Sequence, residues 1–163
     1  MSLPPIESPV CVEHDCVPSE WIDDNGHMSA VYYNHAFRVP IRVFFDGLEL
    51  GFKYREQTGR GIFMLDWRVQ YVREVLQGMA LSFELRLTDT SDKLLHYYVE
   101  MFAGPDRYLA ASCEVVEIQV DLQTRKTVPF GHPLQTYLAE MLLAHRALPE
   151  PVRAMAPFGI RRR

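Results

Sequence analysis

An aromatic stripe of helical spacing, followed by runs of alternating residues, constrains this fold more than any other feature of the sequence. The stripe recurs at spacings of four, four, three and four residues: Tyr33, Phe37, Ile41, Phe44 and Leu48. This period places all five side chains on one face of an α-helix. Because more apolar residues flank the stripe, we expect a helix that is buried on most sides, begins after Ser29 and ends near Leu50. The Ser29 hydroxyl is a candidate N-cap, and Pro40 is expected to kink the helix because it cannot donate a hydrogen bond to Ala36.

Beyond Gly61 the apolar residues alternate with a period of two, which is typical of half-buried antiparallel strands. Turn-forming stretches divide this part of the chain, and a further short strand precedes the helix. The expected strands cover residues 10–17, 63–71, 81–88, 94–102 and 108–120. The alternation slips at Val115 and Val116, which predicts a bulge or burial of both faces. An amphipathic helix over residues 133–148 completes the pattern.

This order of elements predicts one α+β domain over residues 1–148, in which an antiparallel sheet wraps around the long helix. A chain of 163 residues is long enough to bury a core of its own. Residues 149–163 form a tail that contains Pro and Arg, and its prolines disfavour regular structure. An open sheet has edge strands that need protection, and pairing between two subunits is one way of providing it.

Charge and hydropathy disfavour two classes of protein. The formal net charge is −4, with 21 acidic against 17 basic residues, which argues against a nucleic-acid binder that neutralises phosphates. The only basic run is Arg161–Arg163 at the end of the chain. The N-terminus carries no signal-peptide pattern, and the longest apolar-rich segment, residues 30–50, contains four charged residues. We therefore expect a soluble cytoplasmic protein with no membrane partner.

The cysteines predict neither a disulfide framework nor a metal site. The chain has three cysteines, an odd number, and it is large enough to be stable without disulfide bonds. We therefore expect reduced thiols at Cys11, Cys16 and Cys113. Cys11 and Cys16 flank His14 at a spacing that suggests zinc, but they would face opposite sides of a strand and no fourth ligand follows. Cys113 lies in mid-strand, where a small core residue is expected. We predict no metal and no cofactor.

A polar, glycine-bearing loop immediately before the long helix is the candidate site. Asp23, Asn25 and His27 stand at alternate positions and can present a base, an amide and an imidazole to one space. Gly26 lets the backbone approach a ligand closely. The N–H groups of Gly26, His27 and Met28 near the helix start are candidate oxyanion donors. The composition of the loop by itself favours the alternative that Asp23 and Asn25 only make turn bonds that serve the structure.

The segment D-D-N-G-H-M-S-A-V-Y-Y, residues 23–33, and the aromatic helix after it resemble the signature of hot-dog-fold acyl-CoA thioesterases of the 4-hydroxybenzoyl-CoA thioesterase-like family. The typical motif is D-x-N-G-H-M-N, and the resemblance extends over residues 10–127. Asp24 stands where an aromatic residue is common, and Ser29 where Asn is common. The resemblance implies the hot-dog fold, hydrolysis of an acyl-CoA thioester, and a homodimer or homotetramer that completes the binding site.

The same resemblance assigns roles to individual residues. It places the catalytic carboxylate on Asp23, acting as nucleophile or as base for water. Plant acyl-carrier-protein thioesterases carry D-x-N-x-H and a later Y-R-R-E, which map onto Asp23, Asn25, His27 and, through residues 71–74, Glu74. Glu74 has to approach the loop through the fold, from the same or the partner subunit.

The acyl group is not readable from the sequence. The aromatic residues expected near an acyl pocket are Tyr32, Tyr33, Phe37, Trp67 and Tyr71, although core packing explains each of them equally well. The chain also resembles thioesterases associated with carnitine breakdown, and an aromatic cage would suit their trimethylammonium acyl group. Basic groups are needed for the CoA phosphates, and the candidates are Arg68, Arg73, Lys93, Arg125 and Lys126, although an ordinary charged surface explains these residues better.

Two alternatives to hydrolysis stay open at this point. One is a hot-dog protein that binds acyl-CoA without turning it over, which would be marked by loss of Asp23 or His27; both are present. The other is an enoyl-CoA hydratase on the same fold, whose family pattern is D-x-N-P-x-H. Gly26 and His27 depart from that pattern and favour hydrolysis. No G-x-S-x-G or phosphate-loop motif occurs in the chain.

Overall fold

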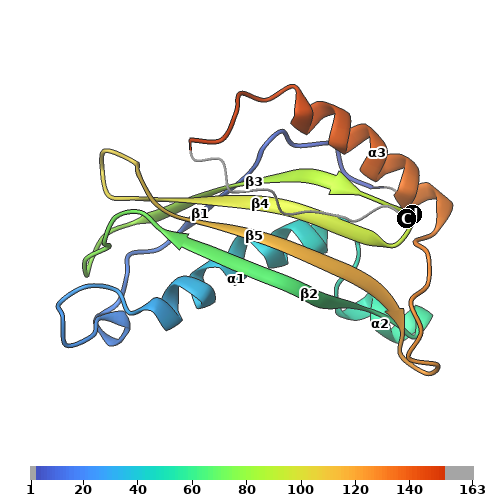
Figure 1. Cartoon of the computed structure of the whole chain (residues 1–163), viewed down its shortest axis with the longest axis horizontal. Helices are drawn as coiled ribbons and strands as arrows, with labels where there is room; N and C mark the ends of the chain where they lie inside the picture. Colours follow the sequence, from blue (N-terminus) through green and yellow to red (C-terminus); the bar gives the residue numbers. More distant parts are fainter. Residues whose placement is uncertain (1–2, 153–163) are drawn as a thin grey trace.

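The computed structural model describes residues 3–152 and consists of one antiparallel sheet with helices packed against it (Figure 1). The strands are β1 (Val10–His14), β2 (Arg60–Tyr71), β3 (Leu81–Thr90), β4 (Leu94–Ala103) and β5 (Tyr108–Asp121). The helices are η1 (Ser19–Trp21, a 3₁₀ turn), α1 (Ala30–Gly47), α2 (Phe52–Thr58) and α3 (His132–Arg146). The strand order is β1-β3-β4-β5-β2, with every neighbouring pair antiparallel. The α+β prediction is confirmed.

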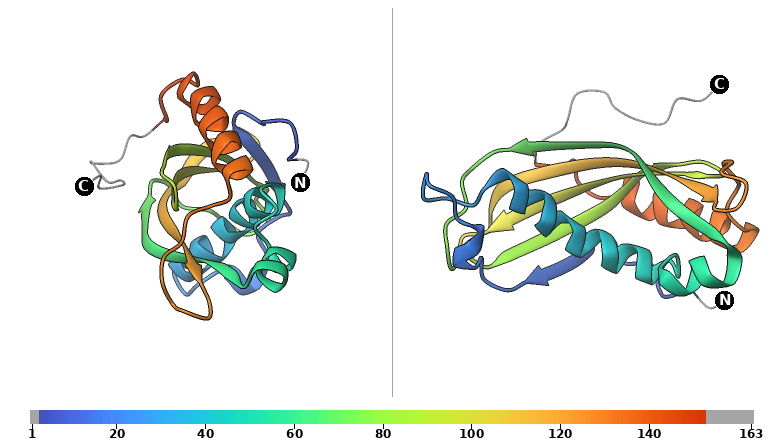
Figure 2. Two further views of the ribbon diagram at one scale, coloured as in Figure 1. Left: turned by 90° about the vertical axis from the view of Figure 1, so that its right-hand side faces the viewer. Right: turned by 90° about the horizontal axis from the view of Figure 1, so that it is seen from below.

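Helix α1 lies along one face of the sheet and supplies the centre of the core (Figure 2). The predicted stripe is buried, including Leu48 just beyond the end of the helix. The prediction of burial on most sides was wrong, because Val31 is 70% and Val43 is 46% exposed. Only one face of α1 meets the sheet, and the opposite face is uncovered in this chain.

The two ends of α1 differ from the sequence prediction. Ser29 occupies the N-cap position, but its hydroxyl makes no capping hydrogen bond. The backbone of Ser29 holds the start of the helix instead, because its N–H donates to the Trp21 carbonyl and its carbonyl accepts a hydrogen bond from the Tyr32 N–H. The helix ends at Gly47, and the separate helix α2 follows. Helix α2 escaped prediction because it is only seven residues long and buries a single side chain, Tyr54.

The strands follow the predicted order with small shifts in their bounds. Strand β1 ends at His14, before the predicted limit at residue 17, so Cys16 is not on a strand and the argument about opposite strand faces does not apply to it. The slip at Val115 and Val116 reflects burial of both faces of β5. The register shift between β2 and β5 lies in β2, between Met64 and Asp66.

Helix α3 protects the part of β3 that β1 leaves unpaired. Strand β1 pairs only with Leu81–Leu85 of β3, and α3 packs along β3. The His145 ring accepts a hydrogen bond from the Leu87 N–H at 2.7 Å through Nδ1, and it lies 2.7 Å from the Glu7 carbonyl through Nε2. A free strand N–H therefore finds a side-chain acceptor. The predicted tail beyond residue 152 lies outside the described residues.

No helix within residues 3–152 has the length and apolar character needed to span a bilayer.

Candidate functional site

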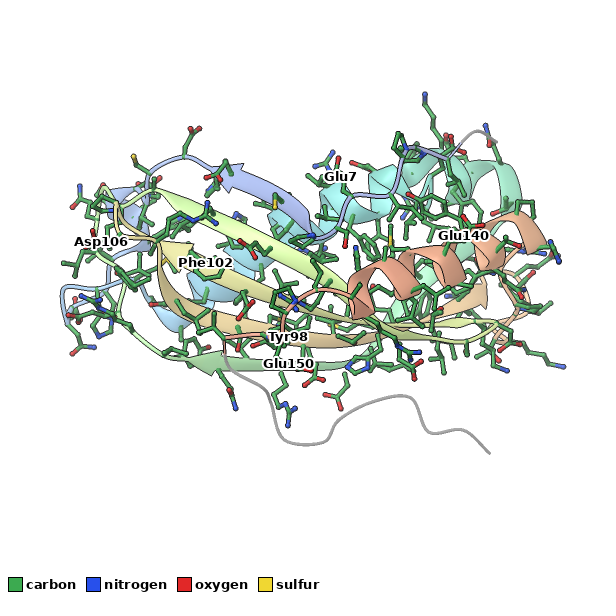
Figure 3. All side chains as sticks on the ribbon, turned by 90° about the horizontal axis from the view of Figure 1, so that it is seen from above. Glu7, Tyr98, Phe102, Asp106, Glu140 and Glu150 are labelled. Atoms are coloured by element: carbon green, nitrogen blue, oxygen red, sulfur yellow. The ribbon has the colours of Figure 1, made fainter. Side chains whose placement is uncertain are left out.

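The D-D-N-G-H-M loop forms a tight turn at the end of the molecule where α1 begins. Figure 3 labels Asp106 at this same end, in the turn between β4 and β5. The Asp23 N–H donates to the His27 carbonyl at 3.0 Å, and the Gly26 N–H donates to the Asp23 carbonyl at 2.9 Å. The Asp23 carboxylate accepts the Asn25 N–H at 2.9 Å. Gly26 has φ +83°, a conformation that glycine adopts without strain, so the turn requires it.

Asp23 and His27 face each other across this turn. The Asp23 Oδ1 atom lies 3.9 Å from His27 Nδ1, and about a third of each side chain is exposed. Nδ1 also lies 3.3 Å from the Met28 carbonyl oxygen, which can only accept a hydrogen bond. A proton on Nδ1 satisfies this contact and leaves Nε2 as the free ring nitrogen. The pair supplies a carboxylate and an imidazole within reach of one water or thioester.

A long-range backbone contact brings Glu74 to the same place. The Met28 N–H donates to the Val75 carbonyl at 2.8 Å, which fastens the segment after β2 to the start of α1. The Tyr108 hydroxyl donates to the Glu74 carbonyl at 2.7 Å, and the Arg73 guanidinium lies 4.0 Å from the centre of the Tyr108 ring. Residues 72–75 are thus held against the motif within a single chain.

A pocket of about 280 Å³ opens between these segments. Its lining residues are His27, Met28, Ala30, Tyr33, Tyr71, Val72, Arg73 and Glu74. The structure therefore brings together His27 and Glu74, two of the four predicted catalytic residues, and two of the five predicted pocket aromatics. Asp23 and Asn25 stand beside the pocket in the loop rather than in its lining.

Two of the three predicted oxyanion amides already have backbone acceptors. The Gly26 N–H donates to the Asp23 carbonyl, and the Met28 N–H donates to the Val75 carbonyl. Within the described part of the chain, the His27 N–H donates to no backbone carbonyl. His27 therefore retains an available donor near the pocket, and Ala30 contributes the first N–H of α1, which has no intrahelical partner.

Tyr33 and Tyr71 form the aromatic wall of the pocket. Their rings meet edge to face with centroids 5.1 Å apart. Burial raises the pKa of Tyr33 to about 12, so its phenol stays protonated at neutral pH and acts as a neutral group. Tyr71 is half exposed, which leaves one side of the wall open to a ligand.

The other three predicted pocket aromatics lie elsewhere. Phe37 is fully buried in the core against Phe83 and Trp67. Tyr32 stacks on Trp21 at 5.4 Å, outside the pocket lining. Trp67 lines a second, larger hollow and donates from Nε1 to Asn34 at 2.8 Å.

The second hollow is a cleft of about 890 Å³ between α1, α2 and β2, which the sequence analysis did not foresee. Four arginines line it: Arg38, Arg42, Arg55 and Arg60. These arginines lie on α1, α2 and β2, and only the tertiary structure brings them together. Arg68, one of the predicted CoA-binding residues, does not line the cleft and is paired with Glu114.

Cys113 is buried in the core, as predicted, and burial raises the pKa of its thiol far above the ordinary value. Among residues 3–152, no group of three or more His, Cys, Asp or Glu side chains is arranged to hold a metal ion.

Comparison with known proteins identifies the family. Residues 17–138 match the model of the thioesterase-like superfamily. The chain belongs to this superfamily. A structure from Staphylococcus aureus, a hypothetical protein in complex with CoA, is 25% identical to this thioesterase and superposes with a TM-score of 0.83 over 98% of this chain and 99% of that one. The hot-dog prediction is thereby confirmed.

Two further relatives carry names that specify a substrate. The betainyl-CoA thioesterase of Pseudomonas aeruginosa is 25% identical over 132 residues, which are 81% of this thioesterase and 83% of the relative. The DHNA-CoA thioesterase of Staphylococcus aureus is 16% identical, with a TM-score of 0.73 over 85% of this chain and 93% of that one. At that identity the second likeness concerns the fold alone.

Proposed function

We propose that this thioesterase hydrolyses acyl-CoA thioesters at the pocket where α1 begins. The observation that carries the proposal is the meeting of His27 and Glu74 at that pocket, with Asp23 3.9 Å from the His27 ring. Carboxylates and an imidazole beside a helix start provide a base, an acid and donors for a developing oxyanion. Membership of the thioesterase-like superfamily supports the same chemistry.

In the proposed reaction, Asp23 takes a proton from water as the water oxygen bonds to the thioester carbon. The carbonyl oxygen becomes an oxyanion, which the His27 N–H and the first turn of α1 stabilise. The C–S bond then breaks and CoA leaves as a thiolate, which accepts the proton that Asp23 took from water, passed on through His27 or solvent, so that Asp23 is regenerated. A thiol pKa near 8.5 makes this last protonation a modest requirement. Asn25 and Glu74 position the water and the Asp23 carboxylate.

The alternative role of Asp23 as a nucleophile predicts a different origin for the new oxygen atom. A single turnover in ¹⁸O-labelled water puts ¹⁸O directly into the acid when Asp23 acts as a base. An acyl-aspartyl anhydride that water attacks at the aspartyl carbon instead releases unlabelled acid in the first turnover and leaves ¹⁸O in Asp23. Unlabelled acid together with a labelled Asp23 peptide, both read by mass spectrometry, therefore demonstrates the nucleophile.

The decisive experiment combines a substrate panel with two neighbouring variants. Saturated acyl-CoA esters, betainyl-CoA and an aromatic acyl-CoA are incubated with a thiol reagent, and crotonyl-CoA is followed for loss of its double bond. Asp23→Asn is expected to reduce turnover by about 10²–10⁴-fold. Asn keeps an oxygen to accept the Asn25 N–H, so the turn survives.

Asp24→Asn is the matched control, because Asp24 is an exposed carboxylate of the same turn. It should leave the rate unchanged. Near-normal hydrolysis by Asp23→Asn would remove Asp23 from the mechanism. Tight binding of every ester without release of thiol would favour a carrier, and hydration of crotonyl-CoA would favour a hydratase.

We further propose that the protein is a homodimer joined along β2, with a homotetramer as the next assembly. Strand β2 is an edge strand twelve residues long. It exposes Phe63 at 40%, Met64 at 42% and Leu65 at 58%. A long edge with exposed apolar side chains favours pairing with a second strand, and a second copy offers a matching one.

A further inference from the structure

The sheet face opposite α1 carries a polar patch that the proposed hydrolysis does not use. Phe83 of β3 meets Phe37 of α1, so the residues that alternate with Phe83 point to the other side of the sheet. Directly paired residues of neighbouring strands share a face, and three such rows cross the four strands β3, β4, β5 and β2 on this side. The rows are Asp89, His96, Val116 and Asp66; Arg86, Tyr98, Glu114 and Arg68; and Glu84, Glu100, Ser112 and Gln70. We call these twelve positions the outer patch.

The centre of the outer patch is buried in spite of its polarity. Glu100 of β4 is 1% exposed and Glu114 of β5 is 7% exposed. Among residues 3–152, the Arg86 Nε and Gln70 Oε1 atoms, at opposite sides of the patch, are buried and have no hydrogen-bond partner. Buried polar atoms without partners are costly. The outer patch therefore suits a covering segment that brings both donors and acceptors.

The chain itself runs onto the outer patch after α3. The Arg86 guanidinium donates to the Pro149 carbonyl at 2.6 Å, and the Val152 N–H donates to Glu100 Oε1 at 2.8 Å. Figure 3 labels Glu150 beside Tyr98 in its view, in agreement with these bonds. The eleven residues that follow Val152 can reach up to about 36 Å when extended. Strand β2 lies only about 10 Å across the sheet from β4, so these residues can span the patch.

The charges of the outer patch and of residues 153–163 are opposite. The patch holds five carboxylates, on Asp66, Glu84, Asp89, Glu100 and Glu114, against two guanidinium groups, on Arg68 and Arg86. Residues 153–163 hold four arginines and no acidic residue. A carboxylate can accept several hydrogen bonds, so Glu114 can bind a further guanidinium beside Arg68.

We propose that residues 153–163 dock on the outer patch of their own chain, with Arg161–Arg163 bound to its carboxylates. A second copy is the less suitable occupant, because a symmetric contact would bring the same acidic surface onto both sides. The basic run then serves to cover the sheet rather than to bind nucleic acid. This inference does not depend on the proposed hydrolysis.

Hydroxyl-radical footprinting read by mass spectrometry tests the docking, because the oxidation of an aromatic side chain follows its exposure. Tyr98 reports on the outer patch, where it is 4% exposed, and Tyr71 is the internal reference near the pocket. A chain that ends at Val152 should show several-fold more oxidation of Tyr98 and unchanged oxidation of Tyr71. Changing Arg161, Arg162 and Arg163 together to Ser keeps the length and should give a smaller rise, which high salt should reproduce in the wild-type protein.

Lys53→Ser is the control, because it removes an exposed positive charge from α2 and should leave Tyr98 protected. Circular dichroism and melting temperature establish that each variant folds, and the full-length triple variant decides the test if the shortened chain unfolds. Unchanged Tyr98 oxidation in the triple variant and in a folded shortened chain would overturn the inference. Protection by a segment of the same chain should not change on dilution. Loss of Tyr98 protection on dilution of the wild-type protein would also overturn it and would assign the patch to a second copy.

Discussion

The carboxylates of this protein are set apart by their surroundings. Asp23 is about a third exposed, and its carboxylate is fixed by a backbone N–H beside solvent. Glu74 lines the pocket through a segment that Tyr108 and Met28 hold in place. Glu117 is enclosed by β4, β5 and α1, where a charge is poorly solvated. The same functional group is thus exposed beside the proposed thioester pocket and buried in the cleft.

Glu117 should make stability fall as pH rises. Its pKa is raised from 4.5 to about 7 by burial, so the folded state holds a proton that the unfolded state releases between these values. The carboxyl therefore costs stability progressively from about pH 4.5 to pH 7 and above. Glu117→Gln has no carboxyl to ionise and so does not lose this stability. The difference in free energy of unfolding, variant minus wild type, should therefore increase by on the order of 3 kcal/mol between pH 4.5 and pH 8. Tyr97 and Arg38 are unchanged in this variant.

Urea denaturation across this pH range measures the effect. Glu56→Gln, at an exposed carboxylate on α2, is the control and should follow the wild-type curve. Parallel pH profiles for Glu117→Gln and wild type would show that Glu117 is ionised in the folded protein throughout the range.

At the scale of elements, the start of α1 is held by backbone pairing rather than by a side-chain cap. Ile22 and Met28 form an isolated bridge, and the Ser29 N–H reaches Trp21. The Trp21 ring stacks between His14 and Tyr32. The motif loop is therefore clamped from β1, from α1 and from the segment after β2.

Gly26 should control both the turn and the rate. An added Cβ at Gly26 meets no atom within 4 Å, so any cost of substitution comes from φ +83°. Gly26→Val is expected to lose at least about 1–2 kcal/mol of stability and to slow hydrolysis by displacing His27. Gly26→Asn, which tolerates this φ better, should lose less of both. Melting temperature and rate are measured together.

Gly47→Ala is the control, because Gly47 also has open space around its Cβ position but has no positive φ. It should be neutral or slightly stabilising. A Gly26→Val protein with wild-type stability and rate would show that neither the turn nor the site depends on this backbone conformation.

At the scale of the whole molecule, one edge of the sheet is covered by a helix and the other edge is exposed. On the β1 side, α3 covers β3 where β1 ends. On the other side, β2 presents its exposed apolar residues, and Val31 and Val43 add exposed apolar surface on the outer face of α1. This asymmetry is the physical basis for the proposed dimer.

Sedimentation equilibrium should therefore give a mass of at least twice 18.9 kDa. Leu65→Glu places a charge on the open edge and should shift the protein towards monomer. Leu143→Glu, at a 68% exposed leucine of α3, should leave the assembly intact. A stable, active wild-type monomer would contradict the proposal, and an unchanged assembly in Leu65→Glu would place the interface away from β2.

The sequence alone determined the order of the elements along the chain, the buried stripe of α1 and the motif loop, because spacing and turn chemistry are local properties of the chain. Only the tertiary structure decided that Glu74 reaches the loop, since this depends on the bond between Met28 and Val75. The engaged amides of Gly26 and Met28, the cleft and the burial of Glu117 were equally beyond local reasoning. Each arises where segments distant in sequence pack together, and periodicity within one segment carries no information about its neighbours in space.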